Sequence, residues 1–276
     1  MAGGKTYPKY SVLMTVYIKE KAEYLKEAID SMLNQTVKPS EFVLVEDGPL
    51  TEDLYNVISL YSNNPIFKII KLEKNCGLGL ALAAGIKECS NEYIARMDSD
   101  DYSVKERIEK QFEEYEKNKN LGIVGTNVEE FNDSITNVIS HVILPEEDEE
   151  IKNFSKKRCP FRHPSLLYKK SAVLKAGNYR NYYLVEDYDI YIRMIKSGCV
   201  CKNIQKPLTY MRISNDFYKR RGGIKYAKSI LKFKNEQLRT GYFNKREYFM
   251  STVPHVIVCL MPNFMRDLFY RKLLRK

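Results

Sequence analysis

Apolar runs alternate with amphipathic segments through the first half of the chain. The runs at 10–17, 41–46, 67–72 and 92–97 are short and rich in β-branched, aliphatic and aromatic residues, so each predicts a buried strand. Between these runs, apolar residues recur at helical spacing. This alternation of strand and helix predicts an α/β fold with a central, mostly parallel sheet flanked by helices.

The second half has a mixed pattern. After 121–131 the periodicity predicts elements that no longer alternate regularly, and from about residue 217 the chain becomes basic and helical. Further helices are expected at 145–157, 171–179 and 185–198, and late strands at 200–204 and 208–213. The predicted organisation is an α/β domain at 1–216, with halves at about 9–130 and 131–216, followed by a basic amphipathic helical tail at 217–276.

Three carboxylates follow the fourth predicted strand in the run ARMDSDDYS: Asp98, Asp100 and Asp101. The next helix, expected to begin at Val104, has a capping box of its own in Ser103 and Glu106, so the aspartates are not needed to start it. A solvated acidic turn is one interpretation of the cluster. The other is a site for Mg²⁺ or Mn²⁺, which take oxygen ligands and bind through carboxylates and substrate phosphates.

The position of the cluster supports a ligand site. In parallel sheets, ligands bind beyond the carboxyl ends of the strands. That rule places Thr15, Tyr17 and Asp47 along the same edge of the sheet as the aspartates.

The charge of the chain is unevenly distributed. The net charge is +10 over 276 residues, yet residues 217–276 contain 15 Lys and Arg against 3 Asp and Glu. Such a tail predicts an anionic partner, either a membrane surface or a nucleic acid. No RNA- or DNA-binding motif accompanies these charges, so we expect no nucleic acid and favour an anionic membrane surface.

The sequence gives little indication of disulfides, a signal peptide or a membrane span. The six cysteines do not have the density of a disulfide framework, and the N-terminal segment lacks the apolar core of a signal peptide. No apolar run approaches the roughly 20 residues of a membrane span. We therefore expect reduced thiols and a cytoplasmic protein that binds peripherally to the inner face of the cell membrane.

Five segments follow one another along the chain: YSVLMTVYIKEKAEYLKEAIDSMLNQT, FVLVEDGPLTED, LEKNCGLGLALAAGIKECSNEYIARMDSDD, HPSLLYKKSAVLKAGNYR and VEDYDIYIRM. Taken in this order, they resemble the family 2 inverting glycosyltransferases with a GT-A fold. Asp98-Ser99-Asp100 matches the DxD motif of that family, and the resemblance extends over roughly residues 9–213.

The resemblance implies a site for a UDP-sugar. Thr15 and Asp47 would lie against the uracil and ribose, with Tyr17 and Ser99 beside them, and Glu46 stands where the family usually has Asp. Asp98 would contact the ribose or a metal-bound water, and Asp100 would bind the cation. Relatives often carry a basic residue where this chain has Leu78 and Leu80, so Lys74 or Asn75 is expected to take over that contact.

The resemblance also implies a catalytic base. Asp187 matches the position of that base, although an Asp there could equally cap the following helix. Glu186 and His163 are expected near the acceptor. Arg96, which lies one residue inside the strand, either supports the site or is a packing residue.

The function predicted from these features is metal-dependent transfer of a hexose from a UDP-sugar to a glycan acceptor, with inversion, in cell-surface polysaccharide synthesis. A lipid-linked acceptor would suit a tail that lies at a membrane through Leu268, Phe269, Leu273 and Leu274, although the tail could also pack on the catalytic domain. Two alternatives remain open. One is a dinucleotide-binding oxidoreductase, which the Leu82 in place of a third glycine disfavours, and the other is a non-catalytic membrane- or RNA-binding module.

Overall fold

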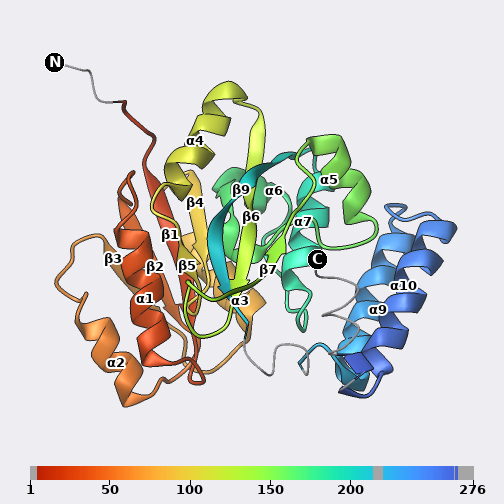
Figure 1. The fold of residues 1–276 in the computed structure, drawn as a ribbon, viewed down its shortest axis with the longest axis horizontal. Helices are drawn as coiled ribbons and strands as arrows, with labels where there is room; N and C mark the ends of the chain where they lie inside the picture. Colours follow the sequence, from red (N-terminus) through yellow and green to blue (C-terminus); the bar gives the residue numbers. More distant parts are fainter. Residues whose placement is uncertain (1–4, 214–219, 264, 267–276) are drawn as a thin grey trace.

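The computed structural model describes residues 5–213, 220–263, 265 and 266. Its centre is one twisted sheet with the strand order β3-β2-β1-β4-β8-β6-β9-β5 (Figure 1). The first four strands are parallel to one another, and their bounds are β1 (Tyr10–Val16), β2 (Glu41–Glu46), β3 (Phe67–Lys71) and β4 (Tyr93–Met97). These strands and their parallel arrangement confirm the prediction from the apolar runs.

The remaining strands extend the sheet beyond β4 in mixed directions. β8 (Leu167–Lys169) is antiparallel to both β4 and β6 (Leu121–Phe131), and β6 runs parallel to β9 (Val200–Arg212). Two further short strands, β5 (Tyr102–Ser103) and β7 (Val138–Val142), pair antiparallel with β9 and β6.

Helices cover both faces because alternate strand residues point to opposite sides. Val12 and Met14 face a core shared with α1 (Ala22–Leu33), α2 (Glu52–Ser59) and α4 (Arg107–Lys117). Leu13, between them, faces a second core. The helices that pack there are α3 (Leu78–Glu88), α5 (Asp148–Ser155), α6 (Lys170–Lys175) and α7 (Glu186–Lys196).

The predicted start of the fourth helix was wrong. Ser103 is not an N-cap: α4 begins at Arg107, its N-cap is Glu106, and no side chain caps it. Ser103 instead lies in β5, opposite Thr209 of β9, and its hydroxyl accepts a hydrogen bond from Gln35 Nε2 at 3.1 Å. Pairing with β9 holds this segment extended, which outweighs the local capping signal.

The two late strands expected at 200–204 and 208–213 are one continuous strand, β9. Register shifts against β6 place Asn127 opposite Pro207 and leave neighbouring residues of β9 unpaired. Such bulges accommodate a proline, which has no N–H to donate, inside a long strand. The sequence break at Pro207 therefore marks an irregularity of the ladder and not the end of a strand.

The basic C-terminal part forms two helices, α9 (Gly223–Arg239) and α10 (Lys245–Leu260), which lie side by side at one end of the molecule (Figure 1). Ile230 and Phe233 of α9 and Cys259 of α10 pack with Tyr188 and Ile192 of α7. The helix pair thus packs against α7 of the α/β domain. The stretch from Leu268 to Leu274 lies outside the described residues.

From the sequence, membrane spans and disulfides were both expected to be absent. Among the described helices, none combines the length and apolar character needed to cross a bilayer. All six cysteines are free thiols, and four of them are buried, namely Cys89, Cys199, Cys201 and Cys259.

Candidate active site

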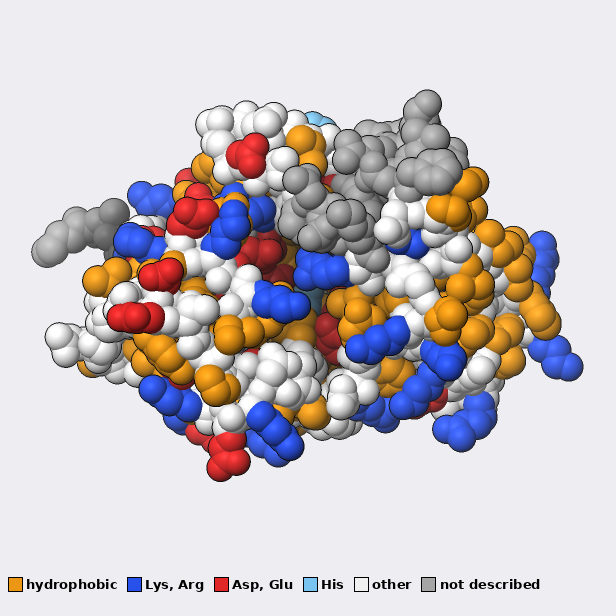
Figure 2. Space-filling model, turned by 90° about the horizontal axis from the view of Figure 1, so that it is seen from below, with side chains coloured by type: hydrophobic (Ala, Val, Ile, Leu, Met, Phe, Trp, Pro, Cys, Tyr) orange, Lys and Arg blue, Asp and Glu red, His pale blue; other side chains and the backbone are white. Residues whose placement is uncertain are grey.

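The carboxyl ends of β1, β2 and β4 open into one large cavity of about 2150 Å³. Figure 2 shows acidic side chains in the hollow of this face, with Lys and Arg side chains around it. The cavity also reaches α7, the loop after α5, the N-terminal half of α9 and most of the length of α10. The predicted site residues that line it are Thr15, Tyr17, Asp47, Asn75, Asp98, Ser99, Asp100, His163, Glu186 and Asp187.

Two predicted site residues are not among the lining residues. Glu46 is 2% exposed, its carboxylate lies 3.8 Å from Lys71 Nζ, and burial raises its pKa against the lowering effect of that lysine. Arg96 is wholly buried and forms an ion pair with Asp98, through Nη2 and Oδ1. Arg96 therefore reaches the site through the carboxylate of Asp98.

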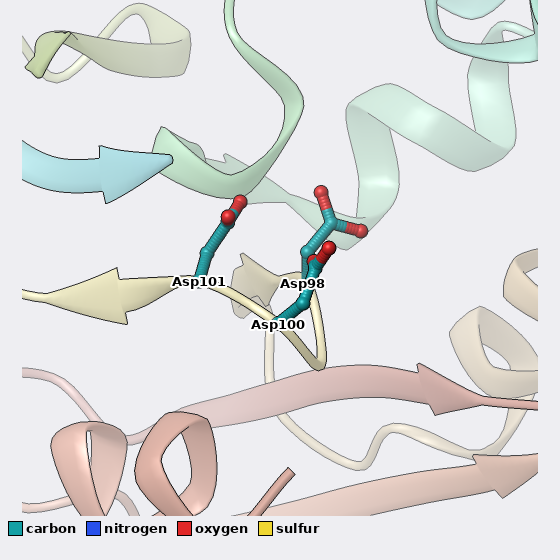
Figure 3. A group of neighbouring side chains, drawn as sticks. All are labelled: Asp98, Asp100 and Asp101. Atoms are coloured by element: carbon teal, nitrogen blue, oxygen red, sulfur yellow. The ribbon is translucent and has the colours of Figure 1, made fainter. Parts of the chain in front are cut away.

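The three aspartates stand together on the loop between β4 and β5. Figure 3 shows Asp98 and Asp100 beside each other, with Asp101 next to them on the same side of the loop. One carboxylate oxygen from each residue lies within 4.8 Å of the other two. This spacing lets three hard oxygen donors reach one divalent cation.

The electrostatics of the cluster are unfavourable without a counter-charge. Burial, followed by the charges of Asp98 and Glu20, raises the pKa of Asp100 to about 8. Burial and the two neighbouring aspartates also raise the pKa of Asp101 well above its ordinary value. Like charges held this close resist ionisation together, and a bound cation removes that cost. The donor set therefore fits Mn²⁺ or Mg²⁺.

Buried polar contacts hold the aspartate loop in place. The backbone N–H of Arg212 donates to Asp101 Oδ1 at 2.7 Å, and Arg212 Nε donates to the carbonyl oxygen of Asp100 at 2.9 Å. On the other side, Ser99 Oγ donates to Glu20 Oε2 at 2.7 Å. Arg212 and Glu20 were not predicted from the sequence, because they are far from the motif along the chain and no local pattern links them to it.

Asp47 organises the neighbouring loop. Its Oδ1 and Oδ2 accept hydrogen bonds from the backbone N–H groups of Cys76 and Gly77, at 2.7 and 3.0 Å, and its carbonyl oxygen accepts one from Asn75 Nδ2 at 3.2 Å. Gly77 has φ +88°, in the left-handed region that glycine tolerates, and α3 begins at the next residue. Asp47 thus fixes the start of α3 at the cavity wall.

The acidic pair at the start of α7 faces the same cavity. Val185, and not Asp187, is the N-cap of this helix, so the capping interpretation of Asp187 is wrong. Asp187 Oδ1 accepts a hydrogen bond from the N–H of Tyr188 at 2.7 Å, and Cys159 Sγ lies 3.8 Å from Oδ2. Burial raises the pKa of Asp187. Burial and the charge of Asp187 raise the pKa of Glu186 to about 7, and Glu186 Oε2 is buried without a hydrogen-bond partner in the described chain.

His163 is also buried at the cavity wall. Its Nε2 lies 2.9 Å from the hydroxyl of Tyr179, and burial together with the charge of Arg96 lowers its pKa well below the ordinary value. His163 is therefore neutral at physiological pH and serves as a hydrogen-bonding group.

Residues 11–177 match the protein family described as Glycosyl transferase family 2. The chain belongs to glycosyl transferase family 2. It is 37% identical over 271 residues to the UDP-Gal:alpha-D-GlcNAc-diphosphoundecaprenol beta-1,3-galactosyltransferase of Escherichia coli, covering 98% of each chain. It is 33% identical to the amylovoran biosynthesis glycosyltransferase AmsE of Erwinia amylovora, covering 95% of this chain and 98% of that one.

A solved structure supports the fold. The mannosyltransferase PcManGT of Pyrobaculum calidifontis, solved in complex with GDP-Man and Mn²⁺, matches with a TM-score of 0.62 at 13% identity, over 95% of this chain and 72% of that one. The fold is the GT-A arrangement expected from the sequence, and the protein is a glycosyltransferase. Membership of the family sets aside both alternatives, the oxidoreductase and the non-catalytic module.

Proposed function

We propose that this family 2 glycosyltransferase transfers a hexose from a UDP-sugar to a glycan acceptor on a lipid carrier, with inversion and with the help of a divalent cation, in cell-surface polysaccharide synthesis. One observation carries the proposal. Three carboxylates able to share a cation line the same cavity as the buried acidic pair, Glu186 and Asp187.

The donor half of the cavity is proposed to bind the nucleotide. Thr15 and Tyr17 at the end of β1 and Asp47 at the end of β2 would contact the uridine, with Asn75 and Ser99 beside it. Asp98 and Asp100 would hold Mn²⁺ or Mg²⁺. When bound, such a cation stabilises the negative charge that develops on the departing UDP.

The acceptor half is proposed to supply the base. Inversion by a single displacement needs one carboxylate that accepts the proton of the attacking hydroxyl. Asp187 is assigned this task. Burial raises its pKa, and burial together with the charge of Asp187 raises the pKa of the neighbouring Glu186. The neutral imidazole of His163, whose Nε2 lies 2.9 Å from the hydroxyl of Tyr179, would line the acceptor pocket.

The lipid-linked acceptor is supported by the relative from E. coli, whose name specifies a diphosphoundecaprenol-linked acceptor. The α9–α10 region adds a physical argument. One side of α10 leaves apolar side chains exposed, with Phe249 60%, Met250 67%, Val253 48%, Ile257 52% and Leu260 57% accessible. Residues 220–263 contain nine Lys and Arg against two Asp and Glu.

This combination supports a peripheral position at an anionic membrane surface. Apolar side chains on one helix face enter the boundary between headgroups and acyl chains, and each nearby cation adds about 1 kcal/mol of attraction to anionic lipid. Met250 both belongs to this exposed face and lines the cavity, so the face adjoins the cavity. In Figure 2 the apolar side chains gather on the side where α9 and α10 lie.

The test is UDP release from a panel of UDP-hexoses with Mn²⁺ and a lipid-linked glycan acceptor, with NMR of the product to assign the new anomeric centre. We expect one UDP-sugar to be used, an inverted linkage, and loss of transfer in Asp187→Asn. Asp53→Asn, an exposed carboxylate at the start of α2, is the matched control and should behave like the wild type. A retained anomeric configuration, or no release of UDP from any sugar nucleotide, would overturn the proposal.

A further inference from the structure

A group of cations lines the cavity around the acidic pair of α7. Arg158 and Arg162 lie on the loop after α5, Arg221 precedes α9, and all three line the cavity together with Asp187. Arg162 is partly exposed at the wall. Three arginines from two separate segments therefore contribute to the wall of this cavity.

The positive field of this group reaches the acidic pair and its surroundings. Burial raises the pKa of Asp187, while the charges of Arg221, Arg96 and Arg162 act in the opposite direction. Burial and then the charges of Lys234, Arg158 and Arg221 lower the pKa of His255, another lining residue, to about 4. A protonated His255 is therefore disfavoured beside an already cationic wall.

Arg162 differs from the buried arginines, whose hydrogen bonds hold parts of the fold together. The buried Arg107 donates from Nη1 to the carbonyl oxygen of Pro164 at 2.6 Å, and Arg193 donates from Nε to Asp189 at 2.9 Å. Within the described chain, by contrast, the guanidinium of Arg162 forms no hydrogen bond or ion pair. A half-buried cation held at a cavity wall without such a partner is available to an anionic ligand.

The chemistry of the reaction says which anion belongs there. The aspartate cluster with its cation would serve the diphosphate of the donor. A neutral sugar acceptor would need no positive charge next to the catalytic base. An acceptor whose sugar ring carries a diphosphate at its anomeric carbon places negative charge about one ring away from the hydroxyl that attacks, and Arg matches phosphate oxygens with paired N–H donors.

We propose that Arg158, Arg162 and Arg221 form the binding site for the diphosphate of the acceptor, and that this site selects sugar acceptors bearing an anomeric diphosphate. The inference rests on the proposed glycosyl transfer and assigns the acceptor anion to named residues. The exposed apolar face of α10 adjoins the cavity, so a lipid attached to that diphosphate would leave toward the membrane.

The binding test does not depend on turnover. Thermal stabilisation of the full chain is measured in EDTA with decyl diphosphate and, separately, with inorganic pyrophosphate. We expect Arg162→Gln to weaken the binding of decyl diphosphate about tenfold to a hundredfold, since a charge-assisted contact to phosphate is lost. Arg239→Gln, an exposed arginine of α9 outside the cavity lining, is the matched control and should bind like the wild type. Equal stabilisation of wild type and Arg162→Gln by decyl diphosphate would overturn the proposal.

The two ligands separate the possible sources of the anion. If decyl diphosphate binds more strongly than pyrophosphate, the site belongs to a lipid-linked acceptor. If both ligands bind the wild type equally and Arg162→Gln abolishes the binding of both, the site recognises the diphosphate alone.

The kinetic test compares two acceptors that share one sugar, an alkyl diphosphate-linked sugar and the alkyl glycoside without phosphate. We expect Arg162→Gln to raise KM for the diphosphate acceptor about tenfold or more, with KM for the UDP-sugar unchanged. A rise confined to KM for the UDP-sugar would instead place these arginines on the donor and overturn the inference. Acceptor-independent release of UDP from the donor separates the two failures, because it persists if only the acceptor assignment is wrong.

Discussion

Arg212, the last residue of β9, forms hydrogen bonds with the loop that carries Asp101. Its backbone N–H donates to Asp101 Oδ1, and its guanidinium donates to the carbonyl oxygens of Asp100, Asn132 and Asp133 and lies 3.8 Å from the centre of the Tyr24 ring. The end of the last strand is thereby fixed to the aspartate cluster, although the two are more than a hundred residues apart in the chain. Arg212 therefore positions the cluster without belonging to it.

We predict that Arg212→Gln weakens binding of Mn²⁺ as well as the fold. Removal of the guanidinium leaves buried carbonyl oxygens without donors, which costs about 2–4 kcal/mol of unfolding free energy. The loosened loop should raise the Mn²⁺ concentration for half-maximal activity about tenfold, a change that a purely structural role would not produce. Denaturant unfolding and a metal titration of UDP release measure the two effects.

The control for Arg212→Gln is Lys202→Met, on the other end of β9, which breaks the ion pairs with Glu146 and Glu147. Lys202 does not line the cavity, so its loss should leave the metal titration unchanged. An unchanged metal titration in Arg212→Gln as well would show that Arg212 does not position the aspartates.

The rate of transfer should fall as the pH decreases through about 7. A base must be unprotonated to accept a proton, and the pKa of Glu186 is raised to about 7 and that of Asp187 is also raised, so the pair binds a proton just below neutrality. Glu186→Gln removes a like charge beside Asp187 and should move the acid limb of the profile to lower pH. The measurement is kcat/KM between pH 5.5 and 8.5 at saturating Mn²⁺.

A flat profile for the wild type, or the same midpoint in Glu186→Gln, would contradict the assignment of the base to this acidic pair. Asp187→Asn should lose at least about a thousandfold in kcat at every pH, because the group that takes the proton is gone. Its unfolding transition should remain cooperative, which separates loss of the base from loss of the fold.

Without metal, the protein should become less stable as the pH rises from 4 to 8. Burial and neighbouring acidic groups raise the pKa of Asp100 from 3.8 to about 8, so between these values the folded state holds a proton that the unfolded state has released. Stability then decreases with rising pH. In EDTA at pH 8, Asp100→Asn should unfold at a higher temperature than the wild type. Its free energy of unfolding should be larger by on the order of 1 kcal/mol after screening by water.

Mn²⁺ should reverse this order of stability. It should stabilise the wild type more than Asp100→Asn, because the variant lacks one of the ligands for the ion. Thermal unfolding in EDTA and in Mn²⁺ measures both effects. A variant that is less stable than the wild type at pH 8 in EDTA would show that the aspartates do not repel one another in the folded protein.

The sequence predicts the first half of the fold well because its signals are local. The four parallel strands lie in apolar runs ended by turn residues, and Asp98 and Asp100 directly follow one of them. The β5–β9 pairing, by contrast, joins Ser103 to Thr209, and no local pattern reveals such a contact. The same holds for Arg212 and Arg162, whose roles depend on which distant groups the fold brings near them.

Binding to anionic vesicles should depend on the exposed apolar face of α10. Ile257 and Val253 are four residues apart on that face, so Val253→Asp combined with Ile257→Asp places two charges where side chains would enter the lipid boundary. We expect wild-type protein to sediment with vesicles that contain phosphatidylglycerol and the double variant to stay in solution, while both use a short-chain acceptor equally well. Leu60→Asp, at the opposite side of the fold beside α2 and 64% exposed, is the matched control and should still bind. If the double variant instead converts a dimer to a monomer and the wild type ignores anionic vesicles, this face is an interface between two copies of the chain and not a membrane-binding surface.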